Sequence, residues 1–559
     1  MRLSFRKVFH DSIIFLHKWL GVTLALLFLM WFMTGLVLYF VPFPELTQFE
    51  RLIALKPIKA QPNCCVTAQQ AADQTGLVFS EARLGMLGEI PVWRLLGQPI
   101  SAPNRDPLWH VIDAQSAKLV APLSLEAAKT VAETFSGRRA VSVQAIDRDQ
   151  WTVPQGLNPF RPLLRVEMDS PDGLELYVSP AAGEVVRDTR REERFWNWLG
   201  AVPHWIYFTE LRRYPKAWHN VVVWLSIPGV ILAVTGIVLG IWHLFLNQVR
   251  WIPYRRFWMK WHHIGGLVTA IFTLTWIFSG LLSMNPFGVF SPKVAMPTEQ
   301  TKWAGPPSDV SLNPVRALIE AQEKLPDLEV KEIDVLRIAG QTWYRLRTST
   351  SQALVRADGR QLNTGQVSTD QFKAPVLLAT LPDETVQASL RFLRNESAQI
   401  SAPVISRIHA YDDLYYAREM NSNTPFKRPL PVWRAQWSDG VAIYADPASG
   451  RLVLRADTST GWQRILYNGL HSFDFAFLLS RPWLRNTLVV VLSLLGIALC
   501  ITSCVIAWRV LFKKVKVGIN LRRIPAINIA RQISASDEGE CTVAKINPRV
   551  TSAPPGEAT

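Results

Sequence analysis

The chain has 559 residues, 49% of them hydrophobic, and a formal net charge of +15. This length leaves room for several domains, and apolar residues gathered in long runs indicate an integral membrane protein. Much of the positive excess lies beside those runs, where it sets orientation and meets anionic lipid. We therefore expect membrane lipid as a partner and no nucleic acid.

Four apolar runs are each long enough to span a bilayer, which needs about 20 consecutive apolar residues in a helix. They cover residues 15–41, 217–243, 262–284 and 485–509. The first run is too long for the apolar core of a signal peptide, and no cleavage site of small residues ends it. The sequence therefore predicts an integral membrane α-helical bundle of four transmembrane helices.

Basic residues flank these spans on one side only. They are Arg2, Arg6 and Lys7 before the first span, Arg250, Arg255, Arg256 and Lys260 between the second and third, and Arg509, Lys513, Lys514, Lys516, Arg522 and Arg523 after the fourth. By the positive-inside rule, segments 1–14, 244–261 and 510–559 are cytoplasmic. We predict a multi-pass protein of a bacterial inner membrane, with both termini in the cytoplasm and a largely disordered tail.

The two long segments, 42–216 and 285–484, then face the periplasm, and their composition predicts two large α+β regions. Alternating apolar residues predict strands within 90–121, with a turn at Asp113–Ser116, and strand–turn–strand units at 172–186 and 439–453. Helices are expected at 124–135 and 313–323.

The two halves of the chain match one another at fixed shifts. A shift of 245 residues takes His17 to His262, Gly21 to Gly266, Trp31 to Trp276 and Gly35 to Gly280. A shift of 267 takes Asp172 to Asp439, Tyr177 to Tyr444, Gly183 to Gly450, His204 to His471 and Thr235 to Thr502. Both copies start on the cytoplasmic side, so we predict a tandem parallel repeat about a pseudo-two-fold axis along the membrane normal.

Histidine is costly in a membrane span, so each histidine there is a candidate functional residue. Two pairs survive the repeat, His17 with His262 and His204 with His471. A pseudo-two-fold axis puts such mates at equal depth on opposite sides, as two axial imidazoles that sandwich one metal require. We predict these four as axial ligands of haem iron, with one haem b near each membrane face. Gly21 and Gly266, one turn along the same helix faces, would let the flat ring approach the backbone.

Other interpretations stay open. His243 could replace His262 as the partner of His17, and His219 could replace either outer histidine. His17 could be only an interfacial anchor, and the glycines could serve close helix packing. Zinc or copper is less favoured, because no carboxylate or cysteine joins the histidines at a fitting spacing.

The five cysteines form no disulfide framework, and Cys64 and Cys65 are simply adjacent in the first long segment. No CxxC or CxxCH motif occurs, so neither a thiol redox motif nor covalent haem attachment is supported. HExxH, GxSxG, GxGxxG and Walker A patterns are absent as well. We expect no built-in nicotinamide or ATP domain.

Three of the spans, FLHKWLGVTLALLFLMWFMTGLVLYF, KWHHIGGLVTAIFTLTWIFSGLL and NTLVVVLSLLGIALCITSCVIAW, resemble the PepSY-associated transmembrane family. The units ending in DGLELYVSPAAGEVV and DGVAIYADPASGRLV resemble PepSY modules. The resemblance covers roughly residues 10–512. Characterised members include inner-membrane ferric-siderophore reductases of the ferrioxamine-reductase type, which hold b-type haem between transmembrane histidines.

The resemblance implies that the family's helix-entry histidine corresponds to His17 and His262, and its outer histidine to His204 and His471. It also implies a periplasmic acceptor, such as a ferric siderophore or similar ferric chelate. Some members are fused to a flavodoxin-reductase-like domain. Nothing of that kind follows residue 512, so we expect a separate electron donor, either a cytoplasmic reductase or quinol.

PepSY modules also occur in inhibitory and sensory settings, so the competing hypothesis is a non-catalytic membrane sensor or assembly protein that binds a peptide or protein partner. A transporter is less favoured, because no acidic residue lies within the four spans. The aromatic stretches Phe287–Phe290, Tyr411–Tyr416 and Trp433–Trp437 could line an acceptor site or belong to an ordinary core.

Overall fold

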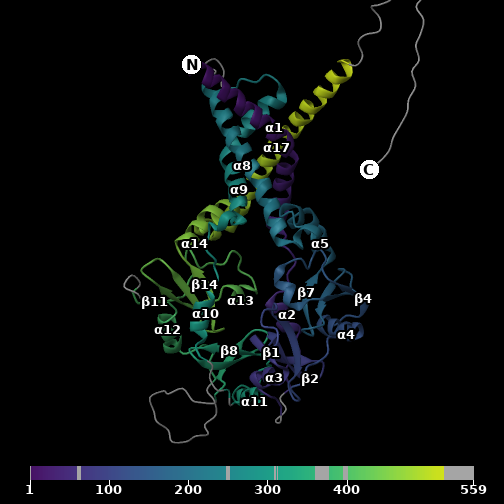
Figure 1. Cartoon of the computed structure of the whole chain (residues 1–559), viewed down its shortest axis with the longest axis vertical. Coiled ribbons are helices and arrows are strands. Elements are labelled where there is room, and N and C mark those ends of the chain that lie inside the picture. Colours follow the sequence, from purple (N-terminus) through teal and green to yellow (C-terminus); the bar gives the residue numbers. More distant parts are fainter. Residues whose placement is uncertain are drawn as a thin grey trace, which may run out of the picture.

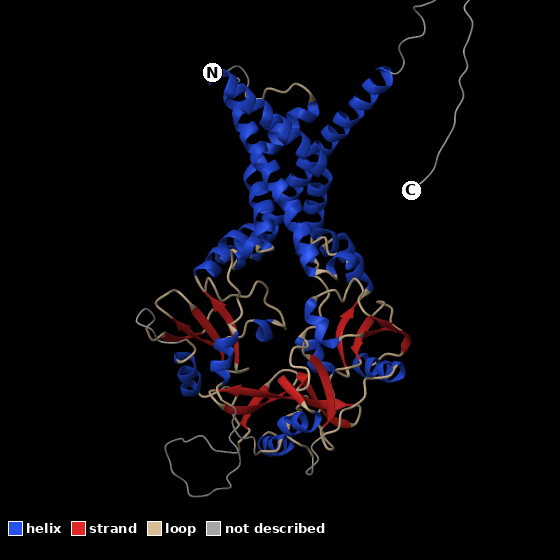
Figure 2. Ribbon diagram, in the orientation of Figure 1, coloured by secondary structure: helices blue, strands red, loops and turns tan. Residues whose placement is uncertain are grey.

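The computed structural model describes residues 2–59, 64–246, 252–306, 310, 312–358, 377–394 and 401–521. A helical bundle forms one end of the molecule, and three β-sheets lie beyond its other end (Figures 1 and 2). The N-terminus and the end of the last helix lie at the same end of the bundle, away from the sheets (Figure 1). Most of the predicted disordered tail falls outside the described residues.

The bundle consists of the four predicted spanning helices. They are α1 (Arg2–Phe40), α8 (Pro215–Leu246), α9 (Phe257–Ser283) and α17 (Pro482–Leu521). All four contain a stretch that is long and apolar enough to cross a membrane. Apolar side chains from α1, α9 and α17, including Phe28, Phe32, Ile277 and Cys500, form the buried centre. The chain is therefore a membrane protein with four spanning helices.

The first extramembrane segment, between α1 and α8, contains short helices and strands in alternation. The helices are α2 (Gln48–Ala54), α3 (Ala68–Thr75), α4 (Leu125–Ser136), α5 (Arg191–Leu199), α6 (Ala201–His204) and α7 (Thr209–Arg212). The strands are β1 (Leu77–Leu87), β2 (Ile90–Pro99), β3 (Leu108–Asp113), β4 (Ala140–Ile146), β5 (Leu163–Met168), β6 (Glu175–Ser179) and β7 (Glu184–Thr189).

The second extramembrane segment, between α9 and α17, has a similar content. The helices are α10 (Pro297–Ala304), α11 (Pro314–Lys324), α12 (Asp383–Arg391), α13 (Thr424–Lys427), α14 (Thr458–Gln463), α15 (Leu470–Ser472) and α16 (Ala476–Leu479). The strands are β8 (Glu332–Ile338), β9 (Gln341–Arg347), β10 (Gln352–Arg356), β11 (Val404–Ile408), β12 (Val432–Gln436), β13 (Ala442–Asp446) and β14 (Arg451–Ala456).

Local sequence signals explain many of these boundaries. Ser124 caps α4 by accepting a hydrogen bond from the Ala127 amide, and α4 ends at Gly137, whose φ of 67° favours glycine. The strand–turn–strand units predicted at 172–186 and 439–453 are confirmed as β6–β7 and β13–β14. Both turns end in a left-handed glycine, Gly183 or Gly450.

Two of the sheets each belong to one segment. The order is β4–β5–β6–β7 in the first segment and β11–β12–β13–β14 in the second, and every neighbouring pair is antiparallel. Strands that are consecutive in sequence are also neighbours in each sheet, so no connection has to cross over another strand.

The third sheet joins the two segments. Its order is β10–β9–β8–β1–β2–β3, so three strands of each segment meet at the antiparallel β1–β8 pair. Arg83 faces Asp334 and Leu84 faces Ile333 in that pair. The core beneath the sheet also mixes both segments, with Trp93 and Tyr344 almost fully buried in it. The two extramembrane segments therefore fold together rather than as separate bodies.

A buried network of arginines and carboxylates crosses the same junction. Arg51 binds Glu332 with both terminal nitrogens, at 2.8 and 2.7 Å, and Arg83 binds Glu184 at 2.7 Å. Arg347 adds a bond of 3.0 Å to Glu332, which is only 2% exposed. Burial alone would raise the pKa of Glu332, but the neighbouring guanidiniums outweigh burial and hold that pKa well below its usual range.

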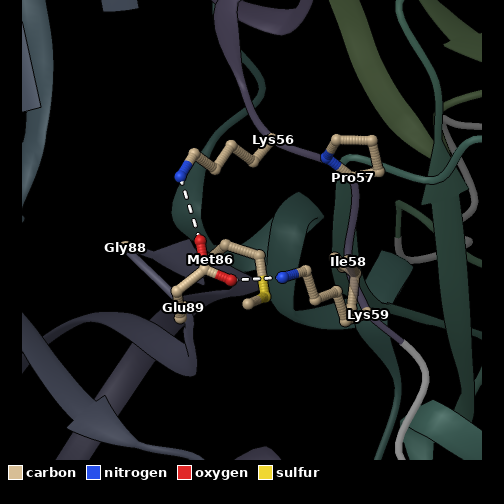
Figure 3. Close-up of a pocket in the computed structure, with 7 residues that line it drawn as sticks. All are labelled: Lys56, Pro57, Ile58, Lys59, Met86, Gly88 and Glu89. Carbon is tan, nitrogen blue, oxygen red and sulfur yellow. Dashed lines mark hydrogen bonds and ion pairs between the residues drawn. The ribbon is translucent and has the colours of Figure 1, made fainter. Parts of the chain in front are cut away.

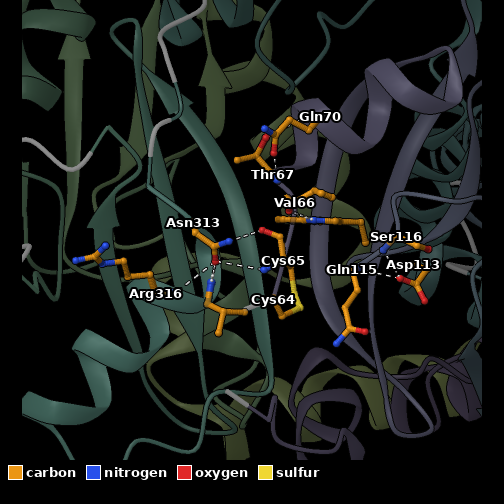
Figure 4. Close-up of a disulfide and its surroundings, with 12 residues drawn as sticks. Cys64, Cys65, Val66, Thr67, Gln70, Asp113, Gln115, Ser116, Asn313 and Arg316 are labelled. Carbon is orange, nitrogen blue, oxygen red and sulfur yellow. Dashed lines mark hydrogen bonds between the residues drawn. A yellow bond between two sulfur atoms is a disulfide. The ribbon is translucent and has the colours of Figure 1, made fainter. Parts of the chain in front are cut away.

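The adjacent cysteines differ from expectation. Cys64 and Cys65 form a disulfide with each other, buried beside the six-stranded sheet (Figure 4). Asn313, at the start of α11, accepts a hydrogen bond from the Cys65 amide at 3.4 Å and donates one to the Cys65 carbonyl. Cysteine spacing predicts disulfides that close a loop of the chain. A bridge between adjacent cysteines closes no loop, so the spacing did not predict it.

Candidate functional site

The inner pair, His17 and His262, lies towards the end of the bundle that carries the N-terminus. His17 projects from α1 and His262 from α9, and their ring centres are 6.4 Å apart with planes tilted by 47°. Both rings are half-buried. Helices from opposite halves of the chain thus bring together two imidazoles that are 245 residues apart.

The outer pair, His204 and His471, lies at the end of the bundle nearer the sheets. The rings come from the short helices α6 and α15, and their centres are 6.2 Å apart. Two residues after each histidine the backbone turns through a positive φ, 52° at Ile206 and 53° at Phe473. Non-glycine residues rarely adopt this conformation. Its occurrence at the same position after both histidines shows that the two rings are followed by the same kind of turn.

A serine or threonine hydroxyl on a neighbouring spanning helix contacts Nδ1 of each ring. The contacts join His17 to Thr235 at 3.3 Å, His262 to Thr502 at 3.1 Å, His204 to Thr34 at 3.3 Å and His471 to Ser279 at 3.1 Å. The predicted repeat makes Thr235 equivalent to Thr502 and Thr34 equivalent to Ser279. The four rings therefore share one kind of anchor.

These contacts favour one tautomer of the rings. Each of the four hydroxyls donates its own hydrogen to a carbonyl of its helix, as Thr34 does to Met30 at 2.7 Å. The hydroxyl oxygen can then only accept from Nδ1–H. Nδ1 of His17 and of His204 also lies 3.2 Å from a backbone carbonyl oxygen, which can only accept. These contacts favour the tautomer with the proton on Nδ1, which leaves the Nε2 lone pair for a metal.

Glycines allow the close approach of two rings, and a third ring lies beside a glycine at an ordinary distance. A Cβ on Gly35 would lie 2.9 Å from Cε1 of His204, and one on Gly236 would lie 2.8 Å from Cε1 of His17. A Cβ on Gly280 would be 3.5 Å from Cε1 of His471, an ordinary contact. Trp31, on the same face of α1 as Gly35, donates its indole N–H to the His204 carbonyl at 3.1 Å.

The two pairs lie near opposite ends of the bundle. Thr34, the partner of His204, is 17 residues beyond His17 on α1, and Ser279 is equally far beyond His262 on α9. At about 1.5 Å per residue, each distance is about 25 Å along the helix. The apolar part of a bilayer is about 30 Å thick, so the pairs lie near its two faces. Phe28 and Phe32 of α1 and Trp276 of α9 belong to the apolar core of the bundle.

These residues fit a haem better than a bare metal ion. Two imidazoles that bind one metal from opposite sides, each at about 2 Å, put their ring centres about 6 Å apart, as both pairs do. Among the described residues, no group of three or more His, Cys, Asp or Glu side chains could hold a metal ion. Haem supplies its own equatorial nitrogens and needs only two protein ligands.

The remaining candidate residues lie elsewhere. His243 on α8 contacts His263 and His10, with ring centres 6.5 and 5.8 Å away, rather than His17. In the described part of the chain, no hydrogen bond or ring contact joins His219 to His204 or His471. A Cβ on Gly21 would be 3.8 Å from Leu232, and one on Gly266 would be 4.0 Å from Leu499. These two glycines face leucines, and their role beside a cofactor stays a prediction.

Sequence reasoning missed the hydroxyl partners of the rings. The repeat relates Thr235 to Thr502 without assigning either a role, and no predicted site includes Thr34 or Ser279. The signal that could have revealed the second pair is the 245-residue shift, which carries Thr34 onto Ser279 as it carries His17 onto His262.

Charged and phenolic groups gather on the second-segment side of the outer pair. Asp474, three residues after His471, is fully buried and binds Arg418 at 2.8 Å and Arg485 at 2.9 Å. The ring of Tyr467 lies 5.7 Å from that of His471. At the corresponding positions of the first segment, Tyr207 stands for Asp474 and Trp218 for Arg485. The surroundings of the outer pair are therefore asymmetric.

A shallow pocket of about 340 Å³ lies in the extramembrane part and is lined by Lys56, Pro57, Ile58, Lys59, Met86, Gly88 and Glu89 (Figure 3). The Glu89 carboxylate binds Nζ of Lys56 at 3.1 Å and also Nζ of Lys59. These exposed charges are paired with each other, and none of the histidines lines this pocket.

The chain was compared with curated protein sequences and with protein-family models. No curated protein sequence matches the chain. The family model described as the PepSY-associated TM region matches residues 15–510, which include both histidine pairs and both extramembrane segments. The chain belongs to the PepSY-associated TM region family.

Proposed function

We propose that this protein is a haem-dependent oxidoreductase of a bacterial inner membrane. It passes electrons from the terminal side of the bundle, where α1 begins and α17 ends, to an acceptor on the side of the β-sheets. The observation that carries the proposal is the spacing of the two histidine pairs, 6.4 and 6.2 Å between ring centres. Two b-type haems, one in each pair, would supply one-electron redox chemistry at each end of the bundle.

The chain's own residues hold and orient the ligands. The hydroxyls on neighbouring helices accept a hydrogen bond from Nδ1, which leaves Nε2 to bind the iron and raises the ligand's basicity. Apolar and aromatic side chains between the pairs exclude water from that layer. We also propose that the halves are a tandem repeat with PepSY-like regions. The matched hydroxyl partners and the β1–β8 junction, with three strands from each half, support this.

We propose a ferric siderophore or a similar ferric chelate as the acceptor. Support comes from the cationic and phenolic groups beside the outer pair. Arg418, Arg464 and Lys293 lie there, and Lys293 Nζ reaches Asn468, three residues before His471, at 3.5 Å. Burial lowers the pKa of Lys293, and the guanidiniums of Arg428 and Arg464, which lower it further, concentrate positive charge in this region. Such a region favours an anionic chelate over a neutral one.

The test is spectroscopic. Reduced-minus-oxidised spectra and a pyridine haemochrome assay of the purified protein should show about two b-type haems per chain. His17→Ala and His204→Ala should each remove about one haem, and His409→Ala, an exposed histidine of the second extramembrane segment, should remove none. Wild-type haem content in both pair variants contradicts the ligand assignment. A colourless, folded wild-type protein contradicts the function and favours a non-catalytic sensor.

The acceptor is tested separately. Ferric desferrioxamine added anaerobically to the dithionite-reduced protein should reoxidise the haem. Arg418→Gln should slow that step without changing haem content. A reduced protein that the chelate does not reoxidise contradicts this acceptor but leaves the haem proposal standing.

A further inference from the structure

A second group of histidines lies at the terminal end of the bundle, outside both pairs. We call it the terminal cluster: His10 on α1, His243 on α8, His263 on α9 and Tyr254 in the connection between α8 and α9. The ring centres of His10 and His243 are 5.8 Å apart, those of His243 and His263 are 6.5 Å apart, and Tyr254 lies 5.5 Å from His263. Three spanning helices thus converge on one aromatic, hydrogen-bonding group.

The cluster contains polar atoms without partners. His263 is 8% exposed, and its Nε2 makes no hydrogen bond to any described residue. Nε2 of His10 is also buried without a partner among those residues. The Tyr254 hydroxyl, by contrast, lies 3.0 Å from Nδ1 of His243. A buried nitrogen left unpaired costs free energy, so it calls for a ligand or another explanation.

The chemistry of the cluster excludes a bare metal ion and favours an organic ring. Within the described ranges, no group of three or more His, Cys, Asp or Glu side chains is placed to hold a metal ion. The walls are aromatic: Trp242 packs edge-on against His10 with ring centres 5.1 Å apart, and Tyr254 lies edge-on to both His243 and His263. A neutral imidazole Nε2 accepts from a hydroxyl or donates to a carbonyl, depending on its tautomer.

The position favours a ligand that comes from the membrane. His10, His243 and His263 each lie in a helix that can span a bilayer, near the end of that helix that lies on the terminal side of the bundle. His263 is also the residue directly after His262 of the inner pair. A ligand bound at His263 would therefore be next to the proposed inner haem, on the side where electrons must enter.

We propose that the terminal cluster binds the head group of a membrane hydroquinone, which serves as the electron donor. The two ring oxygens would bond to Nε2 of His263 and to the hydroxyl of Tyr254. The electron-transfer part of this inference rests on the proposed function, whereas the binding part does not. In the reaction, the hydroquinone loses two electrons and two protons and becomes the quinone. The two electrons would pass to two haem equivalents, and the two protons would go to water on the terminal side of the bundle.

Binding is tested first, without reference to haem. The full-length protein in quinone-free nanodiscs is titrated with decylubiquinone, and binding is followed by calorimetry. Wild type should bind, and Tyr254→Phe and His263→Gln should each weaken binding about tenfold, as expected for the loss of one hydrogen bond. His409→Ala is the control and should bind as wild type does. No binding by wild type, or unchanged binding by both cluster variants, overturns the proposal.

Electron donation is tested next. Decylubiquinol added anaerobically should reduce the haem in wild type, and Tyr254→Phe should slow this about tenfold while dithionite still reduces all haem. Equal rates in wild type and Tyr254→Phe overturn the assignment of the donor site. A protein that binds decylubiquinone but contains no haem refutes the proposed function and leaves the binding site standing.

Discussion

At the scale of single residues, the account depends on how each imidazole is held. A histidine in an apolar bundle could be an interfacial anchor, as His17 alone could be. The hydroxyl contacts argue against that reading, because each of the four rings uses Nδ1 in the same way. A repeated anchor at four places is typical of metal-ligating histidines, whose other nitrogen is usually fixed by a hydrogen bond.

The hydroxyl anchors give the first prediction. Thr502→Val removes one of the two hydroxyls beside His262 Nδ1 with little change in volume and leaves the Ser503 hydroxyl at 3.3 Å. Thr34→Val removes the hydroxyl beside His204 Nδ1 and leaves the Trp31 carbonyl. Loss of such a partner typically weakens metal binding 10- to 100-fold. Haem transfer to apomyoglobin should therefore be faster from both variants. Thr23→Val is the matched control, since this exposed threonine bonds only to its own helix. Unchanged transfer from Thr502→Val and Thr34→Val would show that the anchors do not act on the ligands.

The glycines give a matched pair of substitutions. Gly35→Ala puts a Cβ 2.9 Å from the His204 ring, so the ring must move, whereas Gly280→Ala makes an ordinary contact of 3.5 Å with His471. We expect Gly35→Ala to lose most of the outer haem and Gly280→Ala to keep it, as measured by haem content per chain. Equal haem content in the two variants contradicts the role assigned to the close approach.

At the scale of elements, the junction between β1 and β8 is the least local feature of the fold. The strand–turn–strand units and helices α4 and α11 follow from alternation, caps and turn glycines within a few residues, and they were predicted. The pairing of Leu84 with Ile333 joins residues far apart in sequence. No pattern within either strand specifies its partner, so this junction could not be predicted.

The buried network at that junction gives the next prediction. Glu332→Gln leaves Arg51 and Arg347 without their shared charge partner, and breaking a buried pair in this way costs about 3–5 kcal/mol. The thermal unfolding temperature of the extramembrane part should fall clearly. Glu89→Gln, which alters an exposed ion pair at the pocket of Figure 3, should leave that temperature unchanged. A Glu332→Gln protein as stable as wild type contradicts the role of the network.

The network also predicts a pH dependence. For Glu184, as for Glu332, burial would raise the pKa, but the surrounding guanidiniums, Arg83 foremost, lower it overall. The folded state then binds fewer protons than the unfolded chain in acid. The stability from these carboxyls is therefore complete above their usual pKa of about 4.5 and is lost as the pH falls below it. Unfolding temperatures measured from pH 7 to pH 3 should fall less steeply in Glu332→Gln than in wild type.

At the scale of the whole molecule, the sequence supported the main divisions of the chain. Four apolar runs predicted the four spanning helices, and the resemblance of residues 10–512 to the PepSY-associated family is confirmed by the family match over residues 15–510. The approach of His17 to His262 and of His204 to His471 was predicted from the repeat. Their hydroxyl partners and the terminal cluster depend on how helices rotate against one another, which local periodicity does not specify.

The bundle and the extramembrane part are coupled through the outer pair. His204 lies on α6 and His471 on α15. One short helix, α7 or α16, separates each of them from the spanning helix that follows, α8 or α17. On the other side, each histidine comes after the last strand of its segment, β7 or β14. The six-stranded sheet ties the two segments together. The two outer histidines are therefore held by one connected extramembrane body rather than by two independent ones, which favours a fixed spacing between their rings.

The central claim is that each histidine pair holds one haem, and electron paramagnetic resonance of the oxidised protein tests it most directly. The account predicts two low-spin signals of bis-histidine haem per chain in wild type. His262→Ala should remove one signal and His471→Ala the other, with each remaining signal unchanged. A single signal in wild type would contradict this claim. So would a His262→Ala or His471→Ala variant that keeps both signals.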